Sequence, residues 1–291
     1  PHPPPLPPPF PPPSPPPSPP PESPLSRLLS NAVYFDGSDC VKGRGDSTYL
    51  STVGTISAWF RLESSNTFQT IISSFTTDRA TGMVEMRVGG GPVSGLDGRV
   101  ICQVRQSGFV NEFMFTSTTV ISDSEWHHAI CSWDNGNSQG HMVLDGVEEI
   151  KYSGYAAQTQ NDMRWTEANY AVGCRMEEVN HFSGCLSEVY AIREYFDLSL
   201  EENLRRFRTA DGLPEDLGAQ GSLPTGTQAD VYMSGSLAEW ISGRANAGFG
   251  GAFGMQSGEV SECATHSPPL LPPSPPPSPP PQAPPSLPPP P

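Results

Sequence analysis

Alternating apolar and polar residues run through the middle of the chain in short segments. Residues 55–62, TISAWFRL, place Ile56, Ala58, Phe60 and Leu62 on one face of an extended strand. Comparable strand-like segments occupy residues 31–36, 69–75, 83–88, 99–104, 112–118, 126–133, 141–144, 170–174 and 182–192. Many short strands separated by turn residues predict an all-β sandwich or jelly roll.

Turn chemistry adds detail to this pattern. Asp145-Gly146, flanked by apolar residues, is a type I′ hairpin signal between two of the predicted strands. Glycine-rich sequence follows residue 208, and within it the segments 230–233 and 252–256 are expected to form two edge strands.

One short helix is predicted from Ser199 to about Arg208. Ser199 and Glu202 have the spacing of a capping box, in which the serine oxygen and the glutamate each satisfy a free backbone amide. Three apolar residues at helical spacing form one stripe along it: Leu200, Leu204 and Phe207. Arginines near residue 208 suit the negative end of the helix.

An ordered set of motifs connects these segments to a known family. The set reads AVYFDGSD, TISAWFRLES, DSEWHHAICSWDNG, MVLDGV, VGC, HFSGCLSEVYAI and LSLEEN. It resembles the laminin-G-like, concanavalin A-like lectin/glucanase domains, and the resemblance covers residues 31–208. It implies a concanavalin A-like jelly-roll sandwich. Residues 209–263 resemble more weakly a C-terminal extension of some phage and bacterial members, so the expected domain is 25–267.

Proline separates both ends of the chain from this domain. Residues 1–24 hold 17 of the 36 prolines and residues 268–291 hold 16 more. Consecutive prolines fix φ and remove the amide donor, so neither a helix nor a sheet can form. Each end is therefore predicted to be a polyproline II tail, a rod of roughly 75 Å at about 3.1 Å per residue.

The Ser-Pro-Pro-Pro unit recurs in both tails and resembles the hydroxyproline-rich glycoproteins of plant and green-algal walls, the extensin and pherophorin types. That resemblance implies proline hydroxylation and covalent O-glycans. The residues concerned are Ser14, Pro15, Pro16, Pro17, Ser18, Pro19, Pro20, Pro21, Ser274, Pro275, Pro276, Pro277, Ser278, Pro279, Pro280 and Pro281. No Asn-x-Ser/Thr sequon occurs in the sequence, so any glycan is expected on the tails or on other Ser and Thr residues. A competing interpretation is that the tails are ligands for SH3 or WW domains. Those domains are cytosolic, whereas the cysteines favour disulfides and therefore an oxidising compartment.

Charge and cysteine content favour an extracellular protein. The net charge of −15 disfavours nucleic acid and anionic membranes as partners, and no apolar run is long enough for a membrane span. Six scattered cysteines without zinc-site spacing suit three disulfides in an oxidising compartment. Fifteen pairings exist for six cysteines. We expect Cys174–Cys185, because the segments around these cysteines are predicted to be adjacent strands. Cys102–Cys131 would link two strands in the middle of the sandwich. Cys40–Cys263 is expected by elimination, as the two remaining cysteines.

Catalytic motifs are missing from the sequence. The glucanases of the same group carry a Glu-x-Asp-x-x-Glu strand, because retaining hydrolysis needs two carboxyls about 5 Å apart, and no such motif occurs here. His127 and His128 are adjacent on one predicted strand, so they point to opposite faces and cannot jointly bind one metal there. We therefore expect the protein not to be an enzyme.

Two kinds of binding residue follow from the family resemblance. Many laminin-G-like domains bind calcium, and the candidates for a structural calcium ion are Asp36, Asp39, Glu188 and Asp134, each of which could instead serve as ordinary turn chemistry. Family members also bind glycans through exposed aromatics. The candidates are Trp165, Tyr155 and Trp240, and the alternative for each is packing beneath a loop.

The sequence favours a secreted structural glycoprotein, a β-sandwich bead on O-glycosylated polyproline rods that assembles into a wall, matrix or fibre. Its partners would be copies of itself, other proline-rich wall glycoproteins and glycans. The alternative is a carbohydrate-binding, lectin-like module with proline-rich spacers, and a glycoside hydrolase is a distant third. The proline-rich ends would read continuously from one copy to the next, which suggests one unit of a longer repeat, and the alternative is that they are simply the ends of the chain.

Overall fold

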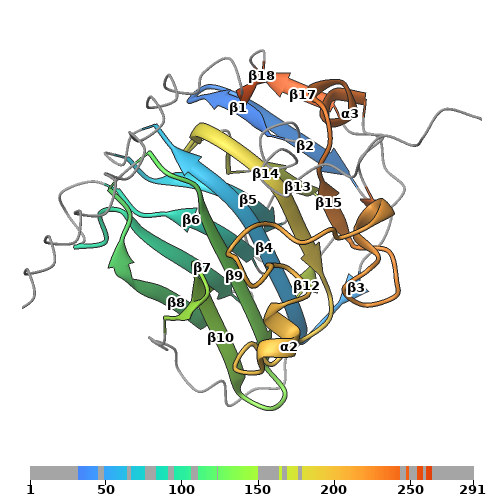
Figure 1. Cartoon of the computed structure of the whole chain (residues 1–291). Coiled ribbons are helices and arrows are strands. Elements are labelled where there is room, and N and C mark those ends of the chain that lie inside the picture. The colour runs from blue at the N-terminus through green and yellow to red at the C-terminus, as the bar shows by residue number, and fades with distance from the viewer. Residues whose placement is uncertain are drawn as a thin grey trace, which may run out of the picture.

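The structure is a computed structural model. It describes residues 32–44, 49–63, 67–75, 83–90, 95–105, 111–122, 124–149, 164–165, 169–175, 179–242, 247–248, 254–257 and 260–263. The two proline-rich segments, with their predicted rods and modification sites, lie outside these residues. The described chain forms a β-sandwich, as the sequence predicted (Figure 1).

The first sheet has seven strands in the order β17-β2-β13-β5-β6-β7-β8. Their bounds are β17 Gly254–Ser257, β2 Cys40–Arg44, β13 Asn169–Val172, β5 Gln69–Phe75, β6 Met83–Val88, β7 Arg99–Arg105 and β8 Asn111–Val120. Every neighbouring pair is antiparallel.

The second sheet has nine strands. Seven of them follow the order β11-β10-β9-β4-β14-β1-β18, while β15 pairs with β14 and β16 pairs with β15. Their bounds are β11 Val147–Glu148, β10 Gln139–Leu144, β9 His127–Asp134, β4 Val53–Leu62, β14 Ser183–Ile192, β1 Val33–Asp36, β18 Ser261–Glu262, β15 Val231–Met233 and β16 Ala247–Gly248. A separate two-stranded sheet joins β3 Tyr49–Leu50 to β12 Arg164–Trp165.

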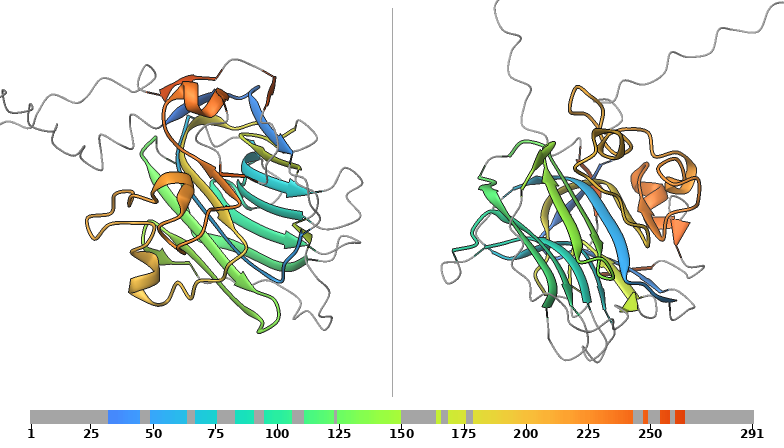
Figure 2. Two further views of the ribbon diagram at one scale, coloured as in Figure 1. Left: turned by 90° about the vertical axis from the view of Figure 1, so that its right-hand side faces the viewer. Right: turned by 90° about the horizontal axis from the view of Figure 1, so that it is seen from below.

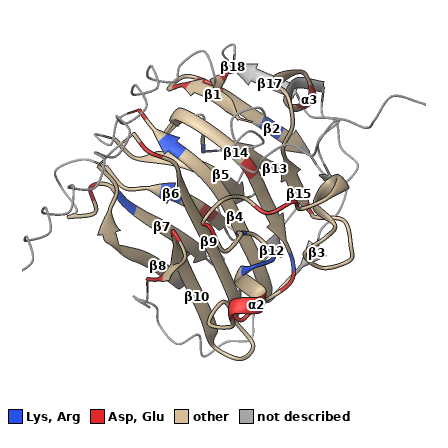
Figure 3. Ribbon diagram, viewed as in Figure 1, with Lys and Arg blue, Asp and Glu red and all other residues tan. Residues whose placement is uncertain are grey.

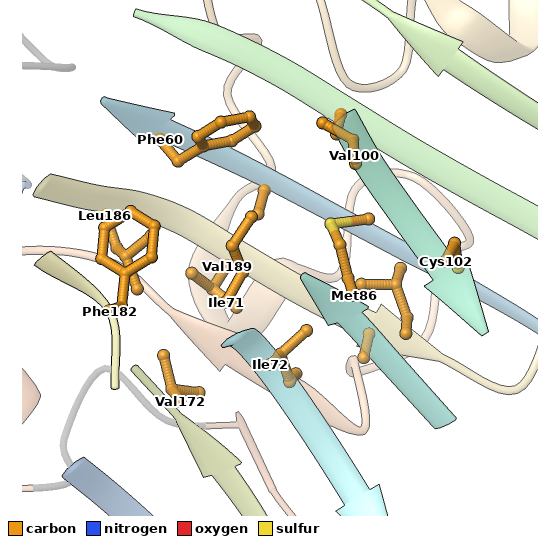
Figure 4. Packing of buried hydrophobic residues seen from close by; sticks show 14 of the residues in the cluster. Phe60, Ile71, Ile72, Met86, Val100, Cys102, Val172, Phe182, Leu186 and Val189 are labelled. Atoms are coloured by element: carbon orange, nitrogen blue, oxygen red, sulfur yellow. The ribbon is translucent and has the colours of Figure 1, made fainter. Parts of the chain in front are cut away.

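The main core lies between the two large sheets. Phe60, Leu186 and Val189 come from the nine-stranded sheet and meet Ile72 and Met86 of the seven-stranded sheet (Figure 4). All five side chains are almost completely buried. Burial of a large apolar side chain contributes about 1.5–3 kcal/mol, so the alternating strands stabilise the sandwich mainly through this interface.

Residues 196–229 add a third layer on the outer face of the nine-stranded sheet (Figure 2, left). A second buried cluster holds this layer in place. It comprises Ile130, Val143, Tyr190, Ile192, Phe196, Leu198, Leu204, Phe207, Leu217, Ala229 and Tyr232. Both faces of β14 are therefore covered, which explains why all of its residues after Ser183 are buried.

The predicted helix is shorter than expected and has a different cap. Helix α2 covers only Glu201–Leu204, and no side chain caps it. The Ser199 hydroxyl instead donates to Asp197 Oδ1 at 2.5 Å, and its oxygen does not accept from a helix amide. Leu200 is exposed, so the predicted apolar stripe is wrong at its first position.

A second helix, α3 Leu237–Ser242, was not predicted. Glu239 Oε2 accepts hydrogen bonds from the Ser236 amide at 2.6 Å and the Ser236 hydroxyl at 2.9 Å, which places the capping interaction here. A 3-10 turn, η1, covers Ala219–Gly221. None of the helices in the described part of the chain is long and apolar enough to cross a membrane.

The structure pairs the cysteines differently from the sequence prediction. The disulfides are Cys40–Cys174 and Cys185–Cys263. Cys174 follows β13 in the seven-stranded sheet and Cys185 lies in β14 of the nine-stranded sheet, so the predicted bond between them is wrong. Because Cys40 bonds to Cys174 and Cys263 bonds to Cys185, the predicted Cys40–Cys263 bond is also wrong.

The third predicted bond is also missing. Cys102 on β7 and Cys131 on β9 belong to different sheets, and both are buried free thiols that face the main core. Burial raises the pKa of the Cys131 thiol, and contact with Cys102 adds to the shift.

Candidate functional site

A polar pocket of about 440 Å³ opens at the rim of the nine-stranded sheet, and we call it the rim pocket. Its lining consists of Ser51, Ile192, Arg193, Glu194, Thr227, Gln228 and Asp230. Ile192 is the single apolar member. One wall is the end of β14 and the other is the segment just before β15, so the rim pocket forms where the third layer meets the sandwich.

Strand pairing fixes the floor of the rim pocket. Ala191 of β14 pairs with Val231 of β15, which brings Arg193 and Asp230 together just beyond that pair. Asp230 accepts from Arg193 Nε at 2.9 Å, from Nη2 at 2.7 Å and from the Arg193 amide at 2.8 Å. A two-pronged ion pair with a third hydrogen bond is rigid, so the floor is preorganised.

The walls present exposed hydrogen-bonding groups. Glu194, Thr227 and Gln228 are exposed, and Ser51 is half-buried. The Thr227 hydroxyl donates to Glu194 Oε1 at 3.3 Å, and the Thr55 hydroxyl donates to the Glu194 carbonyl at 2.7 Å. The first contact links the two walls and the second anchors the end of β14 to β4, while carboxylate, hydroxyl and amide groups remain open to solvent.

The rim pocket is slightly acidic. Its single cation, Arg193, is matched by Asp230, and Glu194 adds a further negative charge. Burial raises the pKa of the Tyr190 phenol beneath this region, and the charges of Glu194 and Asp230 raise it further. Because three donors hold Asp230, it is poorly suited to act as a nucleophile or general base, as one of two carboxylates would in glycoside hydrolysis.

The predicted glycan-contact aromatics have different outcomes. Trp240 is 1% exposed and packs its ring edge-on against Phe35 at 6.1 Å, so stacking on a sugar is ruled out for it. Tyr155 lies outside the described residues. Trp165 lies in β12, where its backbone pairs with Tyr49 two residues before Ser51 of the rim pocket. Glycan contact by Trp165 stays a prediction.

The calcium candidates do not form one site. Asp36 and Asp39 share a turn: Asp36 accepts from the Ser38 amide and hydroxyl, both at 2.7 Å, and Asp39 accepts from the Asp36 amide at 2.9 Å. Hydrogen bonds from Ser38 lower the pKa of Asp36, whereas burial raises the pKa of Asp39.

The other two candidates lie elsewhere. Asp36 pairs with Ser183, so Glu188 lies beyond the opposite end of β1, where Tyr232 and Ser234 donate to it. Asp134 accepts from Asn137 in a separate turn. In the described ranges no three His, Cys, Asp or Glu residues are placed to hold a metal ion. Calcium needs six to eight oxygens, so these residues do not fit it as a set, and calcium binding stays a prediction.

The adjacent histidines lie on opposite faces, as predicted. His127 contacts Phe60 of the main core and places Nδ1 2.7 Å from Asp145 Oδ2. His128 stacks on Trp59, with ring centroids 4.6 Å apart, under the third layer. Each histidine therefore has its own packing partners, and the two do not converge on one site.

Fold and site together define a lectin-like β-sandwich. A model of the concanavalin A-like lectin/glucanase superfamily, of the laminin G type, matches residues 35–194, more than half of the chain. The chain belongs to this superfamily, and the family resemblance seen in the sequence is confirmed. A search of curated protein sequences found no match. The fold and the two disulfides together indicate an extracellular protein.

Solved structures share the fold at low sequence identity. A proposed carbohydrate binding protein from Bacteroides ovatus is 14% identical, with a TM-score of 0.50, over 81% of this chain and 60% of that one. A pentraxin from Limulus polyphemus is 13% identical over 59% and 79%, with a TM-score of 0.44. Domains LG4-5 of the mouse laminin alpha1 chain are 12% identical over 60% and 44%, with a TM-score of 0.43. The chain thus spans less than two thirds of the Bacteroides and laminin chains.

Sequence reasoning did not identify the residues that line the rim pocket. Arg193 and Glu194 directly follow the apolar run of β14, and Asp230 directly precedes β15. Charged residues at the ends of predicted strands were a usable signal, but the pairing of β14 with β15 was needed to bring them together.

Proposed function

We propose that this chain is an extracellular carbohydrate-binding module and that the rim pocket binds the glycan. The observation that carries the proposal is the lining of the rim pocket, in which hydroxyl, amide and carboxylate groups surround a fixed Arg193–Asp230 pair. Sugars are recognised by convergent hydrogen-bonding groups in a concave site, and the volume of the rim pocket lies in the usual range for ligand pockets, about 300–1,000 Å³. Shared fold with the Bacteroides protein supports this proposal over a catalytic one.

Binding rather than catalysis also follows from the state of the acidic residues. Asp230 is saturated by Arg193, which leaves Glu194 as the open carboxylate of the rim pocket. Hydrolysis by the usual mechanisms needs two available carboxylates facing the scissile bond. One open carboxylate can accept hydrogen bonds from sugar hydroxyls without cleaving the glycan.

A glycan array followed by calorimetric titration tests this proposal. Glu194→Gln and Gln228→Ala should each weaken binding of the array's best glycan by about two- to tenfold, which corresponds to the loss of one hydrogen bond of about 0.5–1.5 kcal/mol. Glu202→Gln is the matched control, because Glu202 is equally exposed but lies on α2, outside the rim pocket lining. Unchanged affinity in both pocket variants would reject the rim pocket as the binding site.

A second proposal concerns the proline-rich ends. The Ser-Pro-Pro-Pro repeats at both ends support tails that are hydroxylated, O-glycosylated and rod-like, and that attach this module to a wall, matrix or fibre. Copies of this chain or other proline-rich glycoproteins would then be its partners. Mass spectrometry of tail peptides from the native source should show oxygen additions at proline together with pentose or hexose. Unmodified proline throughout would remove this proposal.

A further inference from the structure

The outer face of the nine-stranded sheet has two different ends. The third layer covers one end through the buried cluster that holds it in place. The other end carries a smaller cluster, in which Ala32, Cys185 and Cys263 are buried while Tyr34 and Trp126 are only partly buried. This second end therefore keeps two aromatic rings at the surface of the described chain.

Three side chains line up across this second end. Arg61 of β4 pairs with Cys185 of β14, and Cys185 pairs with Tyr34 of β1. Trp126 directly precedes β9, and the Arg61 guanidinium lies 5.8 Å from the centre of the Trp126 ring. We call Trp126, Arg61 and Tyr34 the aromatic strip. It runs across the neighbouring strands β9, β4, β14 and β1, so it is about 14 Å long at about 4.8 Å per strand spacing.

Contacts with the sheet hold the aromatic strip in place. The Tyr34 hydroxyl donates to Glu63 Oε2 at 2.6 Å. Arg61 lies near the end of β4, where Figure 3 shows blue, and its Nη2 donates to the sulfur atoms of Cys185 at 3.3 Å and Cys263 at 3.4 Å. All three side chains of the strip are half-buried. The strip is thus a positioned surface with an aromatic ring at each end and a guanidinium between them.

The C-terminal proline-rich segment starts beside this surface. Strand β1 separates β18 from β14, so β18 is expected about 10 Å from β14. Cys263 directly follows β18, yet its Cα lies only 5.8 Å from that of Cys185. The chain therefore bends over the outer face after β18, and the disulfide fixes it beside the middle of the strip. Four residues, 264–267, separate Cys263 from Pro268, where the proline-rich segment begins.

A polyproline rod matches the chemistry of the aromatic strip. Aromatic-lined surfaces bind polyproline II segments at low entropic cost, because the rod is already ordered. Proline has no N–H and the rod has no internal hydrogen bonds, so its carbonyls need donors, and a guanidinium carries only donors. About five residues of rod span the strip at about 3.1 Å per residue, close to one Ser-Pro-Pro-Pro unit.

Charge favours the C-terminal segment over the N-terminal one. The charges of Glu125 and Glu63 both act on Arg61, so the surroundings of the strip are slightly acidic. Residues 264–291 contain no Asp or Glu, whereas residues 1–24 contain Glu22. The short connection of residues 264–267 also gives the C-terminal segment a high effective concentration at the strip.

We infer that the aromatic strip is a docking surface for the C-terminal proline-rich segment of the same chain, residues 268–291. Proline rings pack on Trp126 and Tyr34, and Arg61 donates to carbonyls between them. Docking fixes the direction in which the rod leaves the sandwich. The rim pocket has a different lining, so this inference does not depend on glycan binding there.

Photo-crosslinking of the full chain tests this inference. A photoreactive benzoylphenylalanine in place of Tyr34 keeps an aromatic ring in the strip, and irradiation should join it to residues 268–291, as located by mass spectrometry of the digested protein. Trp126→Ala in that chain should lower the yield about fivefold, because one aromatic contact is lost. Trp126→Phe keeps a ring and should retain most of the yield, which separates loss of the contact from loss of the fold.

The same photoreactive residue in place of Tyr195 is the matched control. Tyr195 is also half-buried, but it contacts His141, whose register partner Ser132 lies far along β9 from Trp126, so it should not react with residues 268–291. In a mixture of isotopically labelled and unlabelled chains, each product should be wholly labelled or wholly unlabelled. Mixed products, which would place a second copy on the strip, would overturn the inference. So would reaction with residues 1–24 instead, no cross-link at Tyr34, full yield in Trp126→Ala, or equal yield from Tyr195.

Discussion

His128 makes the stability of this protein depend on pH in a way that can be isolated. Its side chain is fully buried under the third layer, and its ring stacks on Trp59. Nε2 lies 2.8 Å from the Ser57 hydroxyl, and Nδ1 is buried without a partner among the described residues. Burial lowers the pKa of His128 to about 3; the charge of Arg208 lowers it further, and that of Asp145 partly opposes the shift.

The size of the effect follows from the difference between folded and unfolded states. An unfolded His128 takes up its proton near its ordinary pKa of 6.5, whereas the folded one does so only near 3. The stabilisation is therefore fully present above pH 6.5 and is lost as the pH falls toward 3. One pKa unit corresponds to about 1.4 kcal/mol, so the full loss is about 5 kcal/mol and the loss by pH 4.5 is about 3 kcal/mol.

The double variant Ser57→Ala/His128→Phe isolates this contribution. Phenylalanine keeps a ring on Trp59, and removing the serine hydroxyl as well avoids leaving it unpaired, so the fold should survive. Urea unfolding at pH 7 and pH 4.5 measures the free energy in each protein. The unmodified chain should lose about 3 kcal/mol more than the double variant between these pH values. Ser57→Ala alone should keep the full loss, and equal losses in all three proteins would refute the reasoning.

Two predictions concern the cysteines. The Cys185–Cys263 bond spans 78 residues, so Cys185→Ser/Cys263→Ser should lower the free energy of unfolding by roughly 2–4 kcal/mol. Urea unfolding checks this, and equal stability would contradict it. Cys102 and Cys131 are fully buried free thiols, so iodoacetamide should label neither in the native protein and both in denaturant. Absence of label after denaturation without reductant would show that they are bonded.

Local patterns predicted the parts of the fold that depend on local chemistry. The run TISAWFRL lies within β4, and the Asp145-Gly146 pair forms the expected turn, with φ of 52° and 84°. Glycine and aspartate tolerate this left-handed backbone, which is why two residues suffice as a signal. Alternation located the strands, β14 among them, although β4, β9 and β14 are buried on both faces.

Local sequence patterns did not predict which distant segments pair with each other. Cys174 and Cys185 are close in sequence, yet the chain between them crosses from one sheet to the other. Ser199 and Ser236 both precede a capping-box glutamate, but only Ser236 uses it, because Asp197 attracts the Ser199 hydroxyl. The sequence shows which residues could form a disulfide or a cap, but the tertiary fold determines which of them come into contact.

The rim pocket depends on the same distinction. The family match ends at residue 194, and three of the seven lining residues, Thr227, Gln228 and Asp230, come after it. Those residues are held by the pairing of β15 with β14 and by the apolar cluster beneath the third layer. The extension is therefore part of the folded domain, and the shape of the rim pocket is set jointly by the shared sandwich and by this added layer. A family resemblance that covers only the sandwich is enough to predict the fold. It does not predict the chemistry of the rim pocket, because part of the lining comes from the extension.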